Sequence, residues 1–231
     1  MIKQEELKKA LLDLGVAKVG FCKLEDQLPE KFKHLKSGIS IVIRLSDQII
    51  SDIHPEDGPT HTYFHHYRTV NFLIDQVTLK ATTLLQEWGY LAMAIPASQS
   101  VNEEGWEFKG LFPHRTAATR AGHGWIGKNC CLVTEDFGPR VRLGTVLTNM
   151  EFEYNQPLEE SQCGECNACV KACPAIALKG TKWIPGMERS EIFDPRACSS
   201  HMHQQYQKIG RGSVCGICIK VCPKGNKVLR R

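Results

Sequence analysis

The sequence has no apolar run approaching the roughly 20 residues that a membrane-spanning helix needs, so a spanning protein is not expected. Its first residues are Met-Ile-Lys-Gln-Glu-Glu, with acid where a signal peptide would carry its apolar stretch, and we therefore expect a cytoplasmic protein with no membrane partner. Charge of one sign is not in large excess either. The formal net charge is +4 and 42% of the residues are hydrophobic, which excludes a disordered chain.

One cysteine motif is also missing, although cysteine itself is abundant. The spacing Cys-x3-Cys-x2-Cys, typical of radical S-adenosylmethionine enzymes, does not occur. Of the 11 cysteines, most lie between Cys163 and Cys222. In an intracellular chain, such a density of thiols indicates metal binding rather than disulfide bonds.

Two cysteine runs carry the strongest signal in the chain. The first, Cys163-x2-Cys166-x2-Cys169-x3-Cys173-Pro174, has the spacing of bacterial ferredoxins, whose fourth cysteine binds the other cluster of a two-cluster protein. The second, Cys215-x2-Cys218-x3-Cys222-Pro223, lacks a third closely spaced cysteine, which Cys198 can supply.

These spacings predict two [4Fe–4S] clusters with interleaved ligands. The first cysteine set is Cys163, Cys166, Cys169 and Cys222, and the second cysteine set is Cys173, Cys198, Cys215 and Cys218. Structural zinc is the alternative, because Cys-x2-Cys pairs also bind zinc. The double Cys-Pro ending and the x2-x2-x3 spacing favour iron and sulfide.

The chain up to residue 154 alternates helix and strand patterns. Helices are predicted at 4–14, 57–89 and 113–122, and strands at 16–21, 38–45, 90–95, 131–134 and 141–147. The last two strands are expected to pair around the turn at 136–139. The order predicts an α+β domain over 1–154, with a mixed sheet and helices. From 155 to 231 the apolar periodicity fades, so this second domain is expected to depend on its metal centres for stability.

A glycine-rich loop lies at residues 121–129, Ala-Gly-His-Gly-Trp-Ile-Gly-Lys-Asn. It satisfies Gly-x4-Gly-Lys, but Asn129 stands where a phosphate-binding loop needs Ser or Thr, and the loop follows a helix rather than a strand. These departures argue against an ATPase. Three glycines around Trp125 indicate backbone in close approach to another element or to a large flat ligand.

Several side chains outside these motifs have ordinary explanations. Cys22, Cys130 and Cys131 flank strand patterns and are predicted to be buried structural thiols. His61, His65 and His66 begin the long helix. A polar helix surface is the favoured interpretation, with a metal site or a cofactor cleft as alternatives.

Residues 124–129, the strand at 143–148 and the double cysteine pattern together resemble the epoxyqueuosine reductase family, cobalamin-dependent enzymes related to the reductive dehalogenases. The resemblance is strongest from about residue 110 to 223. It implies a nitroreductase-like domain that binds a corrinoid, followed by a ferredoxin-like domain with two clusters that delivers electrons to cobalt.

The resemblance also implies site residues. Arg115 lies where the family places a corrinoid-contacting arginine. The other expected corrinoid contacts are Gly124, Trp125, Ile126, Gly127, Lys128 and Asn129. In that interpretation the glycines make room for the macrocycle, and the last two side chains donate to its periphery. The family's proton-donating aspartate has no counterpart here, so the candidate proton donors are Glu104, Glu107 and His114.

The leading functional hypothesis is a corrinoid-dependent reductase that receives electrons from an external donor of the ferredoxin or flavodoxin type. Relatives that act on tRNA carry a helical-repeat extension after the second cluster, whereas this sequence ends shortly after Cys222. A small-molecule or nucleoside substrate is therefore expected, with tRNA as a weaker alternative. The competing hypotheses are a non-catalytic two-cluster electron carrier and a flavin-dependent reductase.

Overall fold

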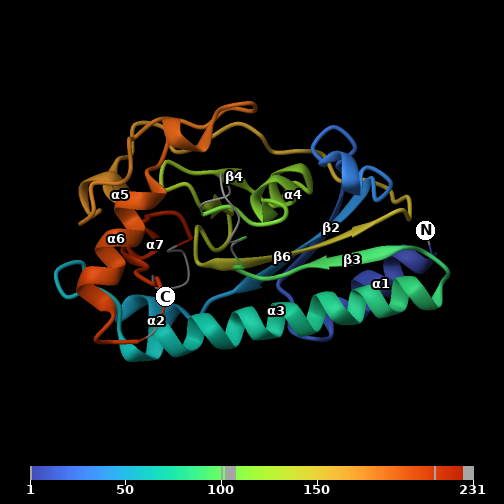
Figure 1. Ribbon diagram of the computed structural model, residues 1–231, viewed down its shortest axis with the longest axis horizontal. Helices are drawn as coiled ribbons and strands as arrows, with labels where there is room; N and C mark the ends of the chain where they lie inside the picture. Colours follow the sequence, from blue (N-terminus) through green and yellow to red (C-terminus); the bar gives the residue numbers. More distant parts are fainter. Residues whose placement is uncertain (1, 100, 102–107, 211, 226–231) are drawn as a thin grey trace. The chain divides into compact units, whose positions relative to one another are not determined.

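The computed structural model describes residues 2–99, 101, 108–210 and 212–225. Within it the chain forms two compact units (Figure 1). The sheet unit comprises residues 1–44, 70–123 and 142–158, and the cysteine unit comprises residues 45–69, 124–141 and 159–231. The sequence predicted two domains that meet at residue 154. In the structure, two earlier segments, 45–69 and 124–141, also belong to the cysteine unit.

The sheet unit is built on four strands: β1 (Lys18–Lys23), β2 (Ser37–Arg44), β3 (Ala92–Ile95) and β6 (Val141–Thr148). Their order across the sheet is β1-β2-β6-β3. In β2 every residue from Ser37 to Ile43 is buried, as expected for a run of β-branched residues in a strand covered on both faces.

The sheet is antiparallel, where a mixed sheet was predicted. β1 pairs antiparallel with β2, and β3 with β6. The Leu45 amide donates to the Arg140 carbonyl, and a Cβ on Gly144 would lie 3.6 Å from the Ile41 Cβ, so β2 and β6 also run in opposite directions. A helical crossover favours parallel strands. Here the helical crossover connects β2 with β3, but these two strands are not neighbours, because β6 lies between them and is antiparallel to both.

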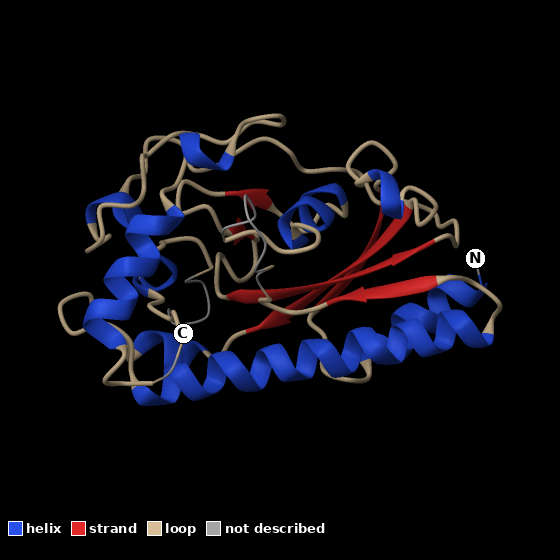
Figure 2. Ribbon diagram, viewed as in Figure 1, coloured by secondary structure: helices blue, strands red, loops and turns tan. Residues whose placement is uncertain are grey.

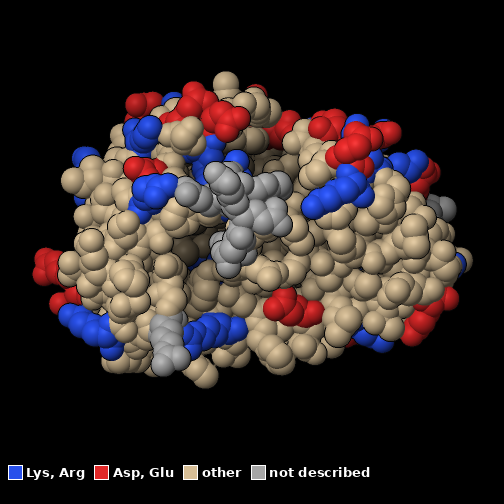
Figure 3. Space-filling view, viewed as in Figure 1, with Lys and Arg blue, Asp and Glu red and all other residues tan. Residues whose placement is uncertain are grey.

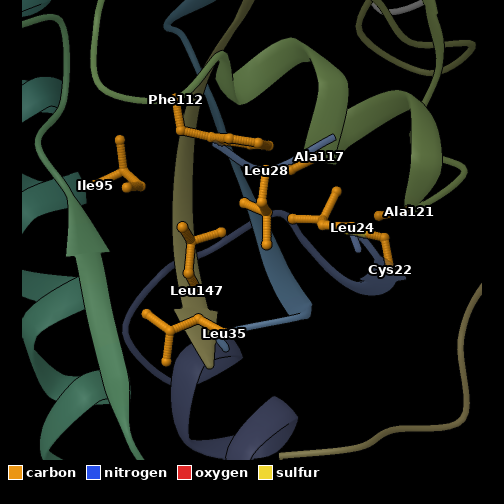
Figure 4. Packing of buried hydrophobic residues seen from close by; sticks show 9 residues of the cluster. All are labelled: Cys22, Leu24, Leu28, Leu35, Ile95, Phe112, Ala117, Ala121 and Leu147. Carbon is orange, nitrogen blue, oxygen red and sulfur yellow. The ribbon is translucent and has the colours of Figure 1, made fainter. Parts of the chain in front are cut away.

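Helices cover both faces of this sheet (Figure 2). α1 (Ile2–Leu12) and the part of α3 (His61–Glu87) within the sheet unit lie on one face, and α4 (His114–Arg120) lies on the other. Gly144 permits the close approach of α3, since a Cβ there would lie 2.7 Å from the Ile74 Cγ2. Figure 4 shows the core beneath α4, formed by Cys22, Leu24, Leu28, Leu35, Ile95, Phe112, Ala117, Ala121 and Leu147.

The cysteine unit has short elements joined by long loops. They are α2 (Asp47–Ser51), β4 (Trp125–Ile126), β5 (Leu132–Val133), α5 (Ala168–Lys171), α6 (Pro195–Tyr206) and α7 (Ile217–Lys220). The predicted pairing of 131–134 with 141–147 is wrong, because β5 pairs with β4 and β6 belongs to the other sheet. The turn is closed locally by a bridge between Thr134 and Gly138, after which the chain leaves the hairpin.

Acidic and basic side chains are interspersed over the face seen in Figure 3, in keeping with a net charge of +4. Among the described helices, none combines the length and the apolar character needed to cross a bilayer.

Candidate metal centre

The first cysteine set lines one cavity in the cysteine unit. Its four members come from the two separate runs, and the remaining lining residues are Lys128, Asn129, Val133, Pro223 and Lys224. Burial, followed by the nearby thiols of Cys222 and Cys163, raises the pKa of Cys169 to about 11. The fold therefore brings Cys222 to the three cysteines that begin the first run, some fifty residues earlier in the chain.

The second cysteine set is also brought together. Burial, followed by Cys215 and Cys173, raises the pKa of Cys198 to about 12. The pKa of Cys218 is raised first by a hydrogen bond with the thiol of Cys131 and then by burial. Cys131 was expected to be a buried structural thiol, but it is half-buried and stands beside this set as a fifth sulfur.

The donor chemistry of both sets fits a [4Fe–4S] cluster, which takes four cysteine thiolates. The raised pKa values of Cys169 and Cys198 keep these two thiols protonated at neutral pH until a metal binds. Binding iron must release those protons, and the free energy of metal binding then contributes to folding. This agrees with the scarcity of long helices and strands from residue 159 onwards.

Arg140 is a functional residue that the sequence interpretation missed. Its side chain is 3% exposed, and its guanidinium donates to the carbonyls of Lys224 at 2.8 Å, Lys220 at 3.3 Å and Cys222 at 3.4 Å. These carbonyls lie at and after the end of α7, where backbone acceptors have no helical partner. Arg140 thus fixes the backbone that carries Cys222. No local motif in the sequence marks an arginine for this task.

The space beside the glycines of the 124–129 loop is filled by other residues of the chain. A Cβ on Gly124 would lie 2.1 Å from the Val133 carbonyl oxygen, and one on Gly127 would lie 2.7 Å from the Val133 Cγ2. All six residues are buried. The interpretation that these glycines leave room for a macrocycle is therefore unnecessary, because β5 occupies that space.

Lys128 and Asn129 likewise have partners within the cysteine unit. The Lys128 Nζ donates to Asn167 at 2.9 Å. The Asn129 amide donates to the Cys218 carbonyl at 3.4 Å and accepts the Cys131 N–H at 3.1 Å. Both side chains join segments that carry cysteines. A role of the loop in corrinoid binding stays a prediction, and these contacts account for its residues without one.

Two other predicted site residues, His114 and Arg115, begin α4 of the sheet unit. His114 hydrogen-bonds Thr145 Oγ1 at 2.9 Å and the Pro96 carbonyl at 3.3 Å. Burial is the main cause that lowers the pKa of His114 to about 4. A neutral ring with both nitrogens engaged is a poor proton donor near pH 7. Arg115, next to it, is half-buried. Glu104 and Glu107 lie outside the described residues.

The histidines that begin α3 have structural partners. His66 accepts the Ser46 N–H at 3.1 Å, and a ring nitrogen of His61 lies 3.1 Å from the Ile209 carbonyl oxygen. His65 is exposed. Two of the three rings therefore hydrogen-bond backbone within the cysteine unit. The sequence had predicted only a polar helix surface for them.

Residues 162–225 match a family described as a 4Fe-4S double cluster binding domain. The chain is 39% identical over 124 residues to the epoxyqueuosine reductase of Bacillus anthracis, a match that covers 50% of this chain and 30% of that protein. It is 32% identical over 143 residues to the enzyme of Gloeobacter violaceus, covering 58% of this chain and 39% of that protein. The chain thus matches well under half of these relatives' length.

Solved structures share the fold at low identity. An epoxyqueuosine reductase bound to an epoxyqueuosine-modified tRNA stem loop is 20% identical, with a TM-score of 0.64 over 97% of this chain and 65% of that one. A catabolic reductive dehalogenase in complex with 3-bromo-4-hydroxybenzoic acid is 18% identical, with a TM-score of 0.73 over 96% of this chain and 31% of that one. With the curated relatives and the double-cluster match, these findings confirm the resemblance to the epoxyqueuosine reductase family that the sequence indicated.

Proposed function

We propose that this protein is an iron–sulfur reductase of the cytoplasm in which two [4Fe–4S] clusters pass electrons to a corrinoid that reduces an electrophilic substrate. The observation that carries the proposal is the interleaved arrangement of the cysteines, with Cys222 of the second run beside three cysteines of the first. Interleaving is the arrangement of two-cluster ferredoxins, which conduct electrons between adjacent clusters.

When bound, a corrinoid would supply low-valent cobalt, the reductant for the substrate. The chain's own residues would hold the clusters and the protons. Lys128 and Lys224 line the cavity of the first cysteine set, and their ammonium groups would offset the negative charge of a thiolate-ligated cluster. Arg140 would hold Cys222 in place through its backbone. Arg115, half-buried at the start of α4, remains the proposed corrinoid contact.

The finer parts of the proposal follow the relatives. We infer that the sheet unit is the nitroreductase-like, corrinoid-binding part, and that an external ferredoxin or flavodoxin supplies the electrons. One relative was solved with a tRNA stem loop and another with a halogenated hydroxybenzoate. A small electrophile or a modified nucleoside, free or within tRNA, is therefore the proposed substrate class. Glu104 and Glu107 remain the proposed proton donors, ahead of His114, whose lowered pKa leaves its ring neutral near pH 7.

The test is titration of the anaerobic, cluster-loaded protein with cob(II)alamin, followed by EPR. Binding should produce a base-off cobalt signal, and dithionite should then reduce the bound cobalt through the clusters. Arg115→Gln should weaken binding by at least tenfold. Arg120→Gln is the matched control, because Arg120 lies in the same helix and pairs with Asp26 at 2.6 Å. Failure to bind micromolar cob(II)alamin, with both clusters intact, would contradict the proposal.

A non-catalytic electron carrier is the second candidate, and one observation favours it. The 124–129 loop was expected to face a corrinoid. Instead, β5 packs against its glycines, and Asn129 hydrogen-bonds a segment that carries cysteines. An intact two-cluster protein that binds neither corrinoid nor flavin would support this candidate. The absorbance spectrum distinguishes the cases, since corrinoids, flavins and bare clusters absorb differently.

A further inference from the structure

The second cysteine set has two non-ligand neighbours that hydrogen-bond its sulfurs. Cys131 hydrogen-bonds the thiol of Cys218, and Tyr206 hydrogen-bonds the sulfur of Cys215. Four cysteines already complete the ligand shell of a cubane. Neither neighbour has a place in that shell or in the proposed reaction.

Asn129 fixes Cys131 beside Cys218. Its carboxamide accepts the Cys131 N–H at 3.1 Å and donates to the Cys218 carbonyl at 3.4 Å, so one side chain ties the two backbones together. The Gly127 N–H also donates to the Cys131 carbonyl at 2.9 Å, and Cys130 adopts a positive φ of 57° in the turn between them. The backbone of Cys131 is therefore held at both its donor and its acceptor.

Tyr206 is held just as firmly against Cys215. Its side chain is 6% exposed, and its hydroxyl lies 3.3 Å from the His201 Nε2. Gly58 is required for the ring to fit, since a Cβ there would lie 2.3 Å from the Tyr206 Cε1. Because an iron-bound cysteine sulfur carries no proton, the hydroxyl is the donor in the hydrogen bond between Tyr206 and Cys215.

Hydrogen bonds to the sulfurs of an iron–sulfur cluster raise its reduction potential, because the reduced cluster carries more negative charge and gains more from each donor. We propose that Cys131 and Tyr206 are tuning residues of the cluster held by the second cysteine set. As thiolate ligands, Cys218 and Cys215 would carry no proton, so the Cys131 S–H would donate to the Cys218 sulfur and the Tyr206 O–H to the Cys215 sulfur. Together they hold the potential of this cluster above the value that its four ligands alone would give.

The inference rests on the part of the proposed function that assigns two clusters, and it needs neither the corrinoid nor the substrate. The experiment is an EPR-monitored redox titration of the anaerobically purified full-length protein. Tyr206→Phe, which removes only the hydroxyl, and Cys131→Ala should each shift the same one of the two cluster transitions to lower potential. Iron and sulfide content should not change. The double variant should show the sum of the two shifts, and Cys131→Ser should recover part of the lost potential.

Two matched controls come from the sheet unit. Tyr154→Phe removes a hydroxyl that hydrogen-bonds Ser37, and Cys22→Ala removes a thiol that hydrogen-bonds the Gly38 carbonyl. Both should leave the two transitions unchanged. Unchanged potentials in Tyr206→Phe and Cys131→Ala, or shifts in two different transitions, would overturn the inference. Loss of about four irons in Cys131→Ala would also overturn it, because Cys131 would then be a ligand. Absence of corrinoid binding would affect only the proposed function.

Discussion

The Arg140 guanidinium donates a hydrogen bond to the backbone carbonyl of Cys222, with Nη2 and oxygen 3.4 Å apart. Cys222 is the one member of the first cysteine set that comes from the distant second run. Since the same guanidinium also binds the carbonyls of Lys220 and Lys224, the arginine orients the whole Cys222-Pro223 turn. The position of the fourth cysteine therefore depends on a residue outside either run.

Arg140→Ala should accelerate the loss of iron from the cluster of the first cysteine set. Hydrogen bonds to a charged group contribute about 1.5–3 kcal/mol each, and three carbonyls lose their donor. Arg140→Lys should rescue little, because an ammonium group cannot span acceptors that the planar guanidinium reaches together. The measurement is the rate of iron release to a chelator, with the exposed Arg120–Asp26 pair supplying the control Arg120→Ala. If Arg140→Ala released iron at the same rate as the wild-type protein, the role assigned to Arg140 would be contradicted.

Gly124→Ala should disrupt the β4–β5 hairpin. The new Cβ would lie 2.1 Å from the Val133 carbonyl oxygen, a backbone atom that cannot rotate away. The expected loss of stability is larger than that of Gly186→Ala, where the space is open and only a positive φ of 85° opposes alanine, at about 1–2 kcal/mol. Denaturant unfolding of the holoprotein measures both. Equal losses would show that the hairpin tolerates the clash.

Two buried histidines should make the sheet unit sensitive to acid. Burial is the largest cause that lowers the pKa of His114 and of His123 to about 4, from 6.5. A depressed pKa in the folded state means that the unfolded chain binds the proton more readily. The stabilising contribution is therefore complete above pH 6.5 and is lost as the pH falls towards 4.

By this linkage, each of the two rings should lower the free energy of unfolding by about 2 kcal/mol when the pH falls from 7 to 5. His114→Gln should reduce the dependence of stability on pH by about half, whatever its effect at pH 7. His65→Gln, at an exposed position of α3, should leave the dependence unchanged. Urea unfolding followed by circular dichroism at both pH values gives the comparison. The same dependence on pH in His114→Gln and wild type would count against this account.

The interleaving of the cysteines predicts which substitutions act on the same cluster. Cys163→Ala and Cys222→Ala should each leave about four irons, and the double variant should also leave about four, because both residues belong to one set. Cys198→Ala combined with Cys222→Ala should leave almost none. If the pair Cys163 and Cys222 lost all iron while each single variant kept half, the assignment of ligands would be wrong.

The sequence predicted most of the sheet unit, because local periodicity is strong there. The helices at 4–14 and 57–89 correspond to α1 and α3, and the apolar strand at 38–45 is β2. Strand direction and partner were not predictable in the same way. They depend on β6 being inserted between β2 and β3, and on Trp125-Ile126 pairing with β5, and neither relationship leaves a local pattern.

The cysteine positions could be predicted from spacing alone, since a cubane imposes its geometry on a short loop. Their supporting residues could not. Arg140 binds backbone carbonyls and Asn129 joins two backbones, so any arginine or asparagine placed there by the fold would look ordinary in the sequence. The glycines of the 124–129 loop correctly predicted a close approach of backbone. The partner in that approach is a strand of the same unit, which the pattern could not distinguish from a flat ligand.

The most direct test of the whole account is the metal and sulfide content of the anaerobically purified protein. Two clusters of four thiolates each predict about eight irons and about eight acid-labile sulfides per chain, with no stoichiometric zinc. Zinc without sulfide, or only four irons with four sulfides in a protein that has not lost metal, would contradict the assignment of two [4Fe–4S] clusters.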